Sequence, residues 1–227
     1  MPAEDYAPII AFAADFSGND AKLVAQVRQM AAKPPTDMET IGFYSAEDDP
    51  PRNRLFLATV NLLDNAGKFI SVEDKYTGEI FALWQEAGVI DGKTLPPAAK
   101  AVFGPLIDGD EEPEGQAAEA YRKLVWRDYA QATQELERHI AARGRVLLSI
   151  DATGGDTMFF AVVSPEIAAR WRDRALSEHG GYRAGVRAPM WDRFWDHLGY
   201  FALDTLGDLK GIPPGTPKRV EAIPFAE

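Results

Sequence analysis

Two aspartates bracket a glycine turn and are the most distinctive polar residues of the chain. Asp151 ends an apolar run and Asp156 precedes another. The turn between them contains Thr153, Gly154 and Gly155. Carboxylates at such a turn can supply oxygen ligands to a hard cation, and glycine N–H groups can bind an anion. Alternatively, the glycines only supply positive φ angles and the aspartates accept backbone hydrogen bonds, so the turn is purely structural.

A second acidic strand end offers further ligands. The order helix, glycine, strand, acidic residue occurs at residues 53–74 and again at residues 130–151. If the two strands are neighbours in one sheet, Glu73 or Asp74 lies near Asp151, although helix–strand units are common enough to arise without true repetition. Such a cluster would suit a metal-assisted hydrolase. Its candidate metal ligands are Asp151, Asp156, Glu73 and Asp74.

An aromatic segment near residue 195 holds the only histidine in a suggestive setting. His197 follows Trp191 and Trp195, and Asp192 or Asp196 could hold it as a general base. The alternative is that His197 lies at the edge of an aromatic packing face. The two tryptophans could also cover a small-ligand pocket, so this segment is a second candidate binding site.

The basic residues between Pro165 and Arg193 are all arginines. Arginine suits forked recognition of carboxylate or phosphate, although the base composition of a GC-rich genome gives the same excess. The six are Arg170, Arg172, Arg174, Arg183, Arg187 and Arg193.

Composition excludes several classes of protein. The formal net charge of −11 disfavours general binding to nucleic acid or to an anionic membrane. The chain has no cysteine, which excludes disulfides, thiolate zinc sites and a cysteine nucleophile. It begins without the pattern of a signal peptide and has no apolar run of the ~20 residues that span a bilayer. We therefore expect a cytoplasmic protein, and the oligomeric state stays open.

The common catalytic signatures are missing. The chain lacks Gly-x-x-x-x-Gly-Lys-Ser/Thr, Gly-x-Gly-x-x-Gly, Gly-x-Ser-x-Gly and His-Glu-x-x-His. We therefore expect no cofactor and favour a function without catalysis.

The segment 145–163 is the element on which the other elements depend. Two runs of branched and aromatic residues flank the Gly-Gly turn, which predicts a β-hairpin. Apolar residues occupy nearly every position of both runs, so the hairpin should be covered on both faces and central in its sheet. Together with a strand near residues 68–74, it predicts an α+β fold: a small, mostly antiparallel sheet centred on the 145–163 hairpin and packed by several helices.

The remaining elements follow from helical spacing and from proline. Helices are expected at 6–16, 21–32, 53–66, 77–87, 116–143, 165–178 and around 190–198, and residues 180–189 are expected to form a glycine-rich loop. Prolines and acidic residues at 89–114 predict a long mobile loop. Four prolines predict an irregular tail at 211–227. The whole chain, 1–227, is expected to form a single domain.

The two helix–glycine–strand units carry a resemblance. With Asp-x-Thr-Gly-Gly-Asp entering an apolar strand and Pro-Glu-x-Ala then opening a helix, they resemble the bacterial Domain of Unknown Function 6630 family. The resemblance covers roughly residues 55–74 and 130–176 and is clearest at 148–163. It implies an α+β fold. The family has no established activity, so the resemblance leaves the function open.

These observations favour a cytoplasmic protein-interaction module, such as a partner- or toxin-neutralising protein, with another protein as its partner. The acidic charge, the missing signatures and the many Trp, Tyr and Arg side chains available as contact anchors motivate this hypothesis. The alternative is the metal-assisted hydrolase that uses the carboxylates around Asp151 and Asp156.

Overall fold

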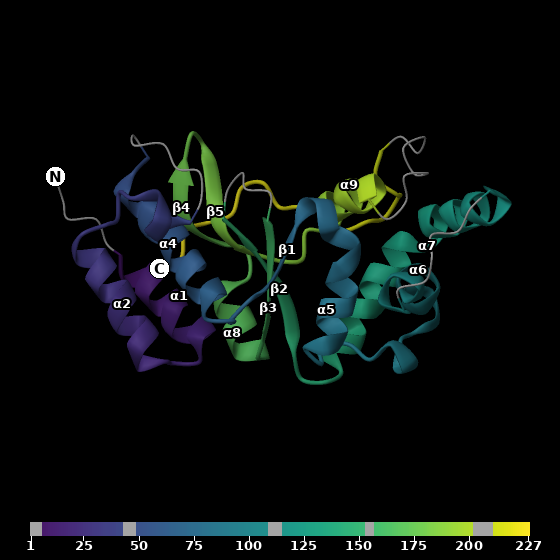
Figure 1. Ribbon diagram of the computed structural model, residues 1–227, viewed down its shortest axis with the longest axis horizontal. Helices are drawn as coiled ribbons and strands as arrows, with labels where there is room; N and C mark the ends of the chain where they lie inside the picture. The colour runs from purple at the N-terminus through teal and green to yellow at the C-terminus, as the bar shows by residue number, and fades with distance from the viewer. Residues whose placement is uncertain (1–5, 43–48, 109–114, 153–156, 202–210) are drawn as a thin grey trace. The chain divides into compact units, whose positions relative to one another are not determined.

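The computed structural model describes residues 6–42, 49–108, 115–152, 157–201 and 211–227 (Figure 1). Its helices are α1 (Ala7–Ser17), α2 (Ala21–Ala32), α3 (Met38–Ile41), α4 (Pro51–Asn65), α5 (Ile80–Glu86), α6 (Pro97–Asp108), α7 (Gly115–Ala141), α8 (Pro165–Trp171) and α9 (Trp191–Phe201), with the 3₁₀ turns η1 (Asp74–Glu79) and η2 (Gly92–Thr94). Its strands are β1 (Ile70–Glu73), β2 (Val146–Asp151), β3 (Thr157–Val163), β4 (Arg174–His179) and β5 (Tyr182–Arg187). The predicted α+β class with a small antiparallel sheet is confirmed.

The strands form one five-stranded sheet in the order β1-β3-β2-β5-β4. The predicted hairpin, β2 and β3, occupies interior positions of this order. Its apolar runs are buried, as their composition predicts: β2 is buried from Leu147 to Asp151 and β3 from Met158 to Ala161. Strand β3 lies between β1 and β2, so the two acidic strand ends considered above do not belong to neighbouring strands.

A second hairpin, β4–β5, replaces the second half of the helix expected at 165–178 and the loop expected at 180–189. Helix α8 already ends at Trp171, and Asp173 adopts a positive φ of 57°. The strands then pair antiparallel from Arg174–Val186 to the last pair, His179–Tyr182. Gly180 and Gly181 form the turn, and both have positive φ, which is what a two-residue hairpin turn of this kind requires. The prediction was wrong because a glycine pair at a tight turn was interpreted as a longer loop.

The expectation of a long loop over 89–114 is also wrong in part, because residues 97–108 form α6. The carboxylate of Glu135 on α7 accepts hydrogen bonds from the N–H groups of Ala98 and Ala99, at 2.9 and 3.2 Å, and so caps the start of this helix. Val102 and Phe103 are fully buried. Contacts with α7 therefore stabilise a helix that the prolines disfavour locally. Residues 109–114 lie outside the described residues.

The chain divides into two compact units. Unit 1 comprises Met1–Ile70, Leu148–Ala188 and Val220–Glu227, and unit 2 comprises Ser71–Leu147 and Pro189–Arg219. Each unit is assembled from segments that are separated in sequence, and two of the boundaries fall inside β1 and β2. No single linker separates the two units, so the division does not split the chain into two consecutive domains. The expected single domain stays a prediction.

Unit 1 contains the β4–β5 hairpin, strand β3 and most of β2. Helix α4 packs against β4, and α1 and α2 pack against α4 (Figure 1). Aromatic rings join these layers: Phe12 on α1 contacts Phe56 on α4 and Trp171 on α8 with centroid separations of 5.7 and 5.8 Å. The Trp171 indole also donates a hydrogen bond to Asp15 at 2.6 Å.

Unit 2 is built on the pairing of α6 with α7 and on an aromatic core. The Phe81 and Phe103 rings stack at 4.4 Å, and Trp84 and Trp191 contact each other edge to face. Irregular chain at 211–219 completes this unit, and within it the Thr216 hydroxyl donates to the Pro213 carbonyl at 2.8 Å.

Candidate functional site

The aspartate singled out at the glycine turn forms a buried ion pair. Asp151 is 2% exposed, and its Oδ2 accepts a hydrogen bond of 2.6 Å from Nε of Arg187, which is 1% exposed. The Tyr182 hydroxyl donates to the same oxygen. Tyr182 and Arg187 both belong to β5, so the second hairpin brings their side chains to the end of β2. The negative charge of Asp151 is thus compensated by an arginine within the protein.

Arg187 uses its remaining donors on backbone carbonyls. Its Nη1 donates to the Val220 carbonyl, and its Nη2 donates to the Arg183 carbonyl at 2.7 Å. A guanidinium presents its donors in a rigid fork, so fixing one nitrogen on Asp151 also fixes the others. Asp151 therefore positions the arginine that binds the segment following Arg219.

That segment, Val220–Glu227, is called the tail segment below, and it covers the outer edge of β4. The N–H of Ala175 donates to the Pro224 carbonyl at 2.7 Å, and the N–H of Ala226 donates to the Ala175 carbonyl at 2.9 Å. These bonds create a parallel bridge between Ala175 and Phe225. The tail segment thus adds a short strand to a sheet edge that would otherwise present unpaired backbone groups.

Two further interactions hold the tail segment in unit 1. Nη1 of Arg183 donates to the Ile223 carbonyl at 2.9 Å. The Ile223 side chain is completely buried, whereas both of its neighbours, Ala222 and Pro224, are exposed. A single apolar anchor and a row of backbone hydrogen bonds therefore fix this segment.

Two guanidinium groups lie close to the Phe225 ring. Cζ of Arg183 on β5 is 4.9 Å from the ring centroid, and Cζ of Arg52 on α4 is 5.6 Å from it. Both separations are within the range of cation–π attraction. Nε of Arg52 also donates to the Leu176 carbonyl at 2.7 Å, which ties this arginine to β4.

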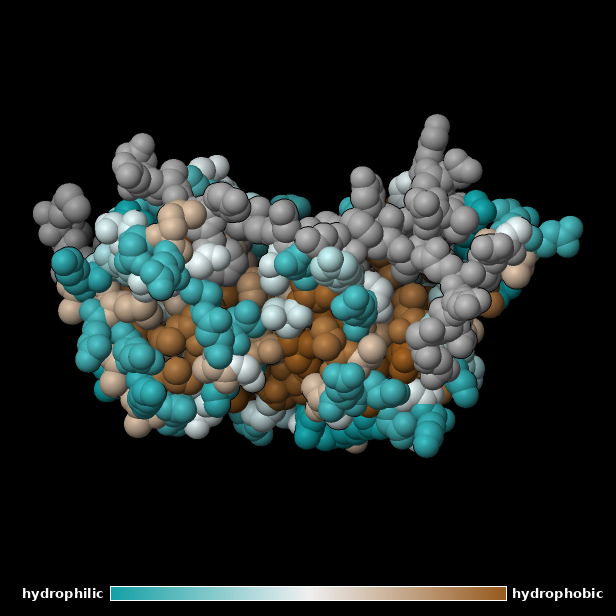
Figure 2. Space-filling model, in the orientation of Figure 1, coloured by the Kyte–Doolittle hydropathy of each residue, from teal (hydrophilic) through white to brown (hydrophobic). Residues whose placement is uncertain are grey.

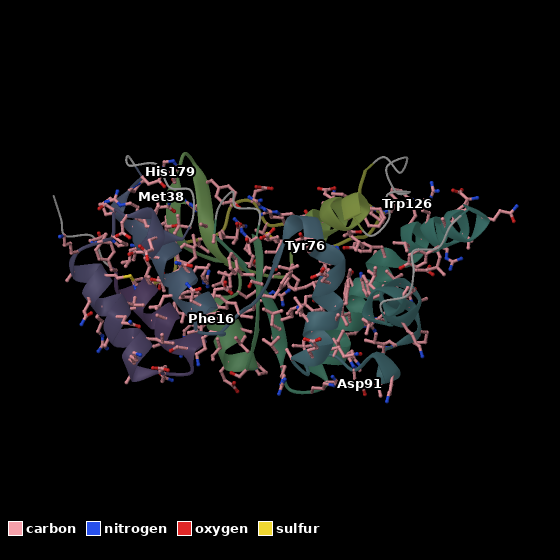
Figure 3. All side chains as sticks on the ribbon, in the orientation of Figure 1. Phe16, Met38, Tyr76, Asp91, Trp126 and His179 are labelled. Atoms are coloured by element: carbon pink, nitrogen blue, oxygen red, sulfur yellow. The ribbon has the colours of Figure 1, made fainter. Side chains whose placement is uncertain are left out.

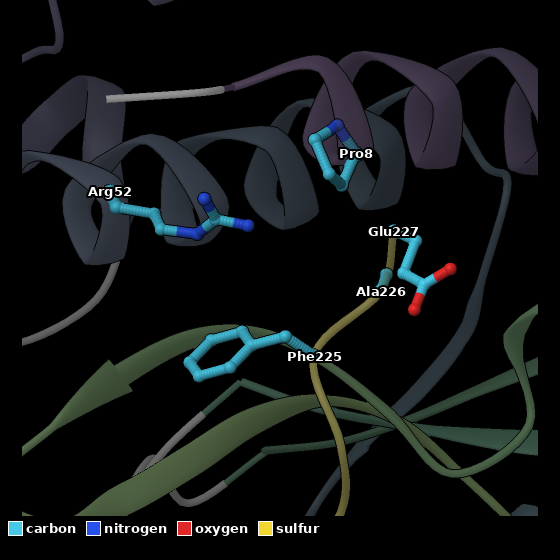
Figure 4. Close-up of a pocket in the computed structure, with 5 residues that line it drawn as sticks. All are labelled: Pro8, Arg52, Phe225, Ala226 and Glu227. Carbon is cyan, nitrogen blue, oxygen red and sulfur yellow. The ribbon is translucent and has the colours of Figure 1, made fainter. Parts of the chain in front are cut away.

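A pocket of about 270 Å³ opens beside this ring (Figure 4). It is lined by Pro8, Arg52, Phe225, Ala226 and Glu227. Figure 4 shows the Arg52 side chain extending from its helix above the Phe225 ring, with Pro8 on the adjacent helix. The surface on which the tail segment lies, formed by Pro8, Arg52, Ala175, Arg183 and Arg187, is called the tail groove below.

A polar network next to the tail groove connects α4 to β4. His179 Nε2 lies 3.2 Å from Asp49 Oδ1, and the Asn53 amide donates to Asp49 Oδ2 at 3.3 Å. The buried Ser177 hydroxyl donates to Asn53 Oδ1 at 3.0 Å. His179 is half-exposed at the end of β4 (Figure 3). Because the hydroxyl of Ser177 is buried and bonded to Asn53, this network cannot present it as a nucleophile, and we assign the network a structural role.

Part of the predicted carboxylate cluster is described. Thr153, Gly154, Gly155 and Asp156 lie outside the described residues, as does the side chain of Asp74. Glu73 is exposed at the end of β1. Across the described portion of the chain, no group of three or more His, Asp or Glu side chains is arranged to hold a metal ion. A metal site that includes Asp156 stays a prediction, although Asp151 is already engaged by Arg187.

The two tryptophans of the predicted aromatic site are core residues, and the role of His197 as a general base stays a prediction. Trp191 and Trp195 are buried, and their indole N–H groups donate to Glu137 at 2.5 Å and to the Gly211 carbonyl at 3.0 Å. Burial, reinforced by the negative charges of Asp192 and Asp196, raises the pKa of neighbouring Tyr129 well above its ordinary value. The side chain of His197 lies outside the described residues. The two indoles thus serve packing in unit 2.

Sequence reasoning missed the tail groove. Two of its members, Arg183 and Arg187, belong to the run of arginines suited to forked recognition. Each pairs with a carboxylate, Glu178 or Asp151, and also with a backbone carbonyl of the tail segment. The only local signal was the Gly180–Gly181 pair, which marks the β4–β5 hairpin. No sequence pattern connects Ala175 to Pro224.

Comparison of the chain with protein-family models, curated proteins and solved structures finds no match. The resemblance to the Domain of Unknown Function 6630 family therefore stays a prediction. Within the described residues, every helix is too short or too polar to cross a membrane.

Proposed function

We propose that the protein is a cytoplasmic protein-interaction module, without catalysis of its own, which binds an extended segment of a partner in the tail groove. One observation carries this proposal: the tail segment is held through its backbone, by Ala175, Arg183 and Arg187. Groups that bind carbonyls and N–H groups accept any extended chain, which is how many domains bind a peptide by adding a strand to a sheet edge. The tail segment then occupies the groove until a partner replaces it.

The distribution of exposed apolar side chains supports this proposal. On the face seen in Figure 2, hydrophobic residues gather in several areas that hydrophilic residues surround. Among the described residues, the large apolar side chains that remain exposed are Met38, Tyr76, Val220 and Phe225. Two of these four, Val220 and Phe225, belong to the tail segment, so this segment keeps apolar surface exposed while it occupies the groove.

The charges of two groove arginines are balanced inside the protein. Arg187 pairs with the buried Asp151, and Arg183 pairs with Glu178. The groove therefore selects a partner segment by its backbone and its apolar side chains rather than by negative charge. A neutralising role, in which the module occupies a functional segment of another protein, is one form of this function. The absence of cysteine supports the cytoplasmic location.

The test measures binding of a labelled peptide with the sequence of residues 218–227 to the full chain. Ile223→Asp places a carboxylate where the apolar anchor is buried, so it should release the tail segment and open the groove. Fluorescence anisotropy should then show at least about tenfold tighter peptide binding to Ile223→Asp than to the wild type, since affinity scales with the fraction of open groove.

The matched control is Val220→Asp, which introduces the same charge at an exposed position of the tail segment. It should bind the peptide as weakly as the wild type. If Ile223→Asp keeps the far-ultraviolet circular dichroism of the wild type and still binds no peptide, the proposed function is wrong. Ala226→Pro provides a second opening variant without a buried charge, because it removes the N–H that donates to Ala175.

A further inference from the structure

From the arginines around Phe225 we infer the chemical class of the partner: an extended segment in which an aliphatic residue, a proline and an aromatic residue follow one another. The aromatic ring of the partner occupies the place of Phe225, close to Arg52 and Arg183. This inference rests on the proposed function and adds the specificity of the groove to it. The tail segment, with Ile223, Pro224 and Phe225, is the template.

The aliphatic position is defined by burial. Ile223 is completely buried, whereas Phe225 remains 39% exposed. In an extended chain, residues two apart point to the same face, so the groove takes both side chains at once. The first side chain enters the interior, where a polar or charged group would lose its hydration without compensation. The second side chain lies over the groove.

The aromatic position is defined by two cations that other contacts hold in place. Arg52 is tied to the Leu176 carbonyl at 2.7 Å, and Nε of Arg183 is bonded to Glu178 at 2.8 Å. Neither of these contacts involves the tail segment. Both guanidinium groups therefore keep a bonding partner when the tail segment is displaced. An aromatic face attracts them electrostatically, with Trp most effective, and an aliphatic side chain does not.

The pocket beside Phe225 permits a larger ring. Its volume of about 270 Å³ is lined by Pro8 and Arg52 and by Phe225, Ala226 and Glu227 of the tail segment itself. A tryptophan at this position would extend into that space and keep its face against the arginines. We therefore expect the groove to accept tryptophan at least as well as phenylalanine.

Proline suits the position between the two anchors. The Pro224 carbonyl accepts the Ala175 N–H, and the bridge uses N–H groups only from Ala175 and Ala226. Proline has no N–H to leave unpaired, and its fixed φ favours an extended chain before binding. The segment therefore loses less conformational freedom when it binds.

The experiment uses full-length Ile223→Asp, or Ala226→Pro if the former does not fold, as the receptor. The probes are labelled peptides with the sequence of residues 218–227 in which the phenylalanine is kept or replaced by Trp, Leu or Ala. Phe and Trp peptides should bind with dissociation constants at least about fivefold lower than the Leu peptide, the difference expected from two cation–π contacts. A peptide with Asp in place of the isoleucine should not bind.

Receptor variants assign this preference to the arginines. Adding Arg52→Gln to the receptor should reduce the preference for the Phe peptide over the Leu peptide by at least about twofold, because only the contact with Arg183 remains. Arg170→Gln is the matched control, because Arg170 pairs with Asp15 and contributes nothing to the groove; it should leave the preference intact. Equal binding of the Phe and Leu peptides to the receptor that retains Arg52 would overturn this inference and leave the proposed function standing. Failure of every peptide to bind would overturn the proposed function.

Discussion

Arg187 and Asp151 form an ion pair in which both side chains are almost completely buried, with Nε and Oδ2 2.6 Å apart. One consequence is that the carboxylate at the glycine turn is committed to an arginine. Another is that the arginine, held by this carboxylate, delivers a second nitrogen to the Val220 carbonyl. The end of β2 is thereby connected to the tail segment by a single side chain.

Asp151→Asn should strongly destabilise the fold. It removes the negative charge but leaves the Arg187 guanidinium buried, and breaking one partner of a buried pair costs about 3–5 kcal/mol. Urea unfolding measures this loss in the free energy of unfolding. Asp128→Asn is the control, because its ion pair with Arg127 lies at the surface and contributes about 0–1 kcal/mol. Equal effects of the two substitutions would contradict the importance of burial.

Gly185→Ala should disturb β4 at the point where the tail segment pairs. A Cβ at Gly185 would lie 2.2 Å from the Arg174 carbonyl oxygen and 2.9 Å from Ala175 Cα, both backbone atoms that cannot turn away. We expect a loss of roughly 1–3 kcal/mol in the free energy of unfolding, as in other overpacked sites.

Gly104→Ala in α6 is the control, because a Cβ at this position has room: it would meet only Lys100 Cγ, at 3.6 Å. It should stabilise the helix by up to about 1 kcal/mol.

The sequence predicted those elements whose signals are local. The apolar runs around Asp151 identified the β2–β3 hairpin and its interior position, because a strand covered on both faces has apolar residues at nearly every position. The long amphipathic helix expected at 116–143 appears as α7, Gly115–Ala141. In both cases the residues that decide the structure are close together in the chain.

Elements that depend on distant partners could not be predicted in this way. Helix α6 needs Glu135 to cap its first turn, and nothing near Pro97 signals that carboxylate. The bridge at Ala175 needs Phe225, and the pairing of His179 needs Asp49. The candidate site is made entirely of such relationships, so the sequence indicated its arginines without indicating what they bind.

Glu135→Ala should cost about 1 kcal/mol at neutral pH, the usual effect of losing a helix cap. Burial acts to raise the pKa of Glu135, but hydrogen bonds from Gln131, Ala99 and Ala98 lower it more, so the folded-state pKa lies below the ordinary value. A depressed folded pKa gives stability that is present above the unfolded pKa and is lost as the pH falls through the folded pKa. The difference between wild type and variant should therefore shrink on acidification.

Urea unfolding at several pH values between about 7 and 3 measures this dependence. Glu135→Gln is the matched control, because its amide oxygen can still accept from Ala98 and Ala99 without a titrating charge. Its cost should be smaller than that of Glu135→Ala. A cost of Glu135→Ala that stays constant with pH would contradict the assignment of the cap to the ionised carboxylate.

Divalent cations test the hydrolase alternative. Because Asp151 is paired with Arg187, we expect Mg²⁺, Mn²⁺ and Ca²⁺ to leave the thermal midpoint of the wild type unchanged. A cation bound only by the folded state at about 100 times its dissociation constant would add about 2.7 kcal/mol and raise the midpoint by several degrees. A rise that is absent in Asp156→Ala would contradict our expectation and restore the metal-assisted hydrolase.

Arg187→Lys should release the tail segment while keeping the positive charge. The guanidinium of Arg187 bonds to Asp151 and to two backbone carbonyls at once, and a lysine ammonium is a point charge that cannot reproduce this fork. Hydrogen exchange of the Ala226 amide reports the docked state, because this N–H donates to Ala175. The protection of this amide against exchange should fall by at least about tenfold.

Arg172→Lys is the control, because Arg172 is half-exposed and its contact to Asp173 is 4.0 Å long. This substitution should leave the protection of the Ala226 amide unchanged. Unchanged protection in Arg187→Lys would mean that Ile223 and the bridge at Ala175 hold the segment alone, and the connection from Asp151 to the tail groove would then have no energetic importance.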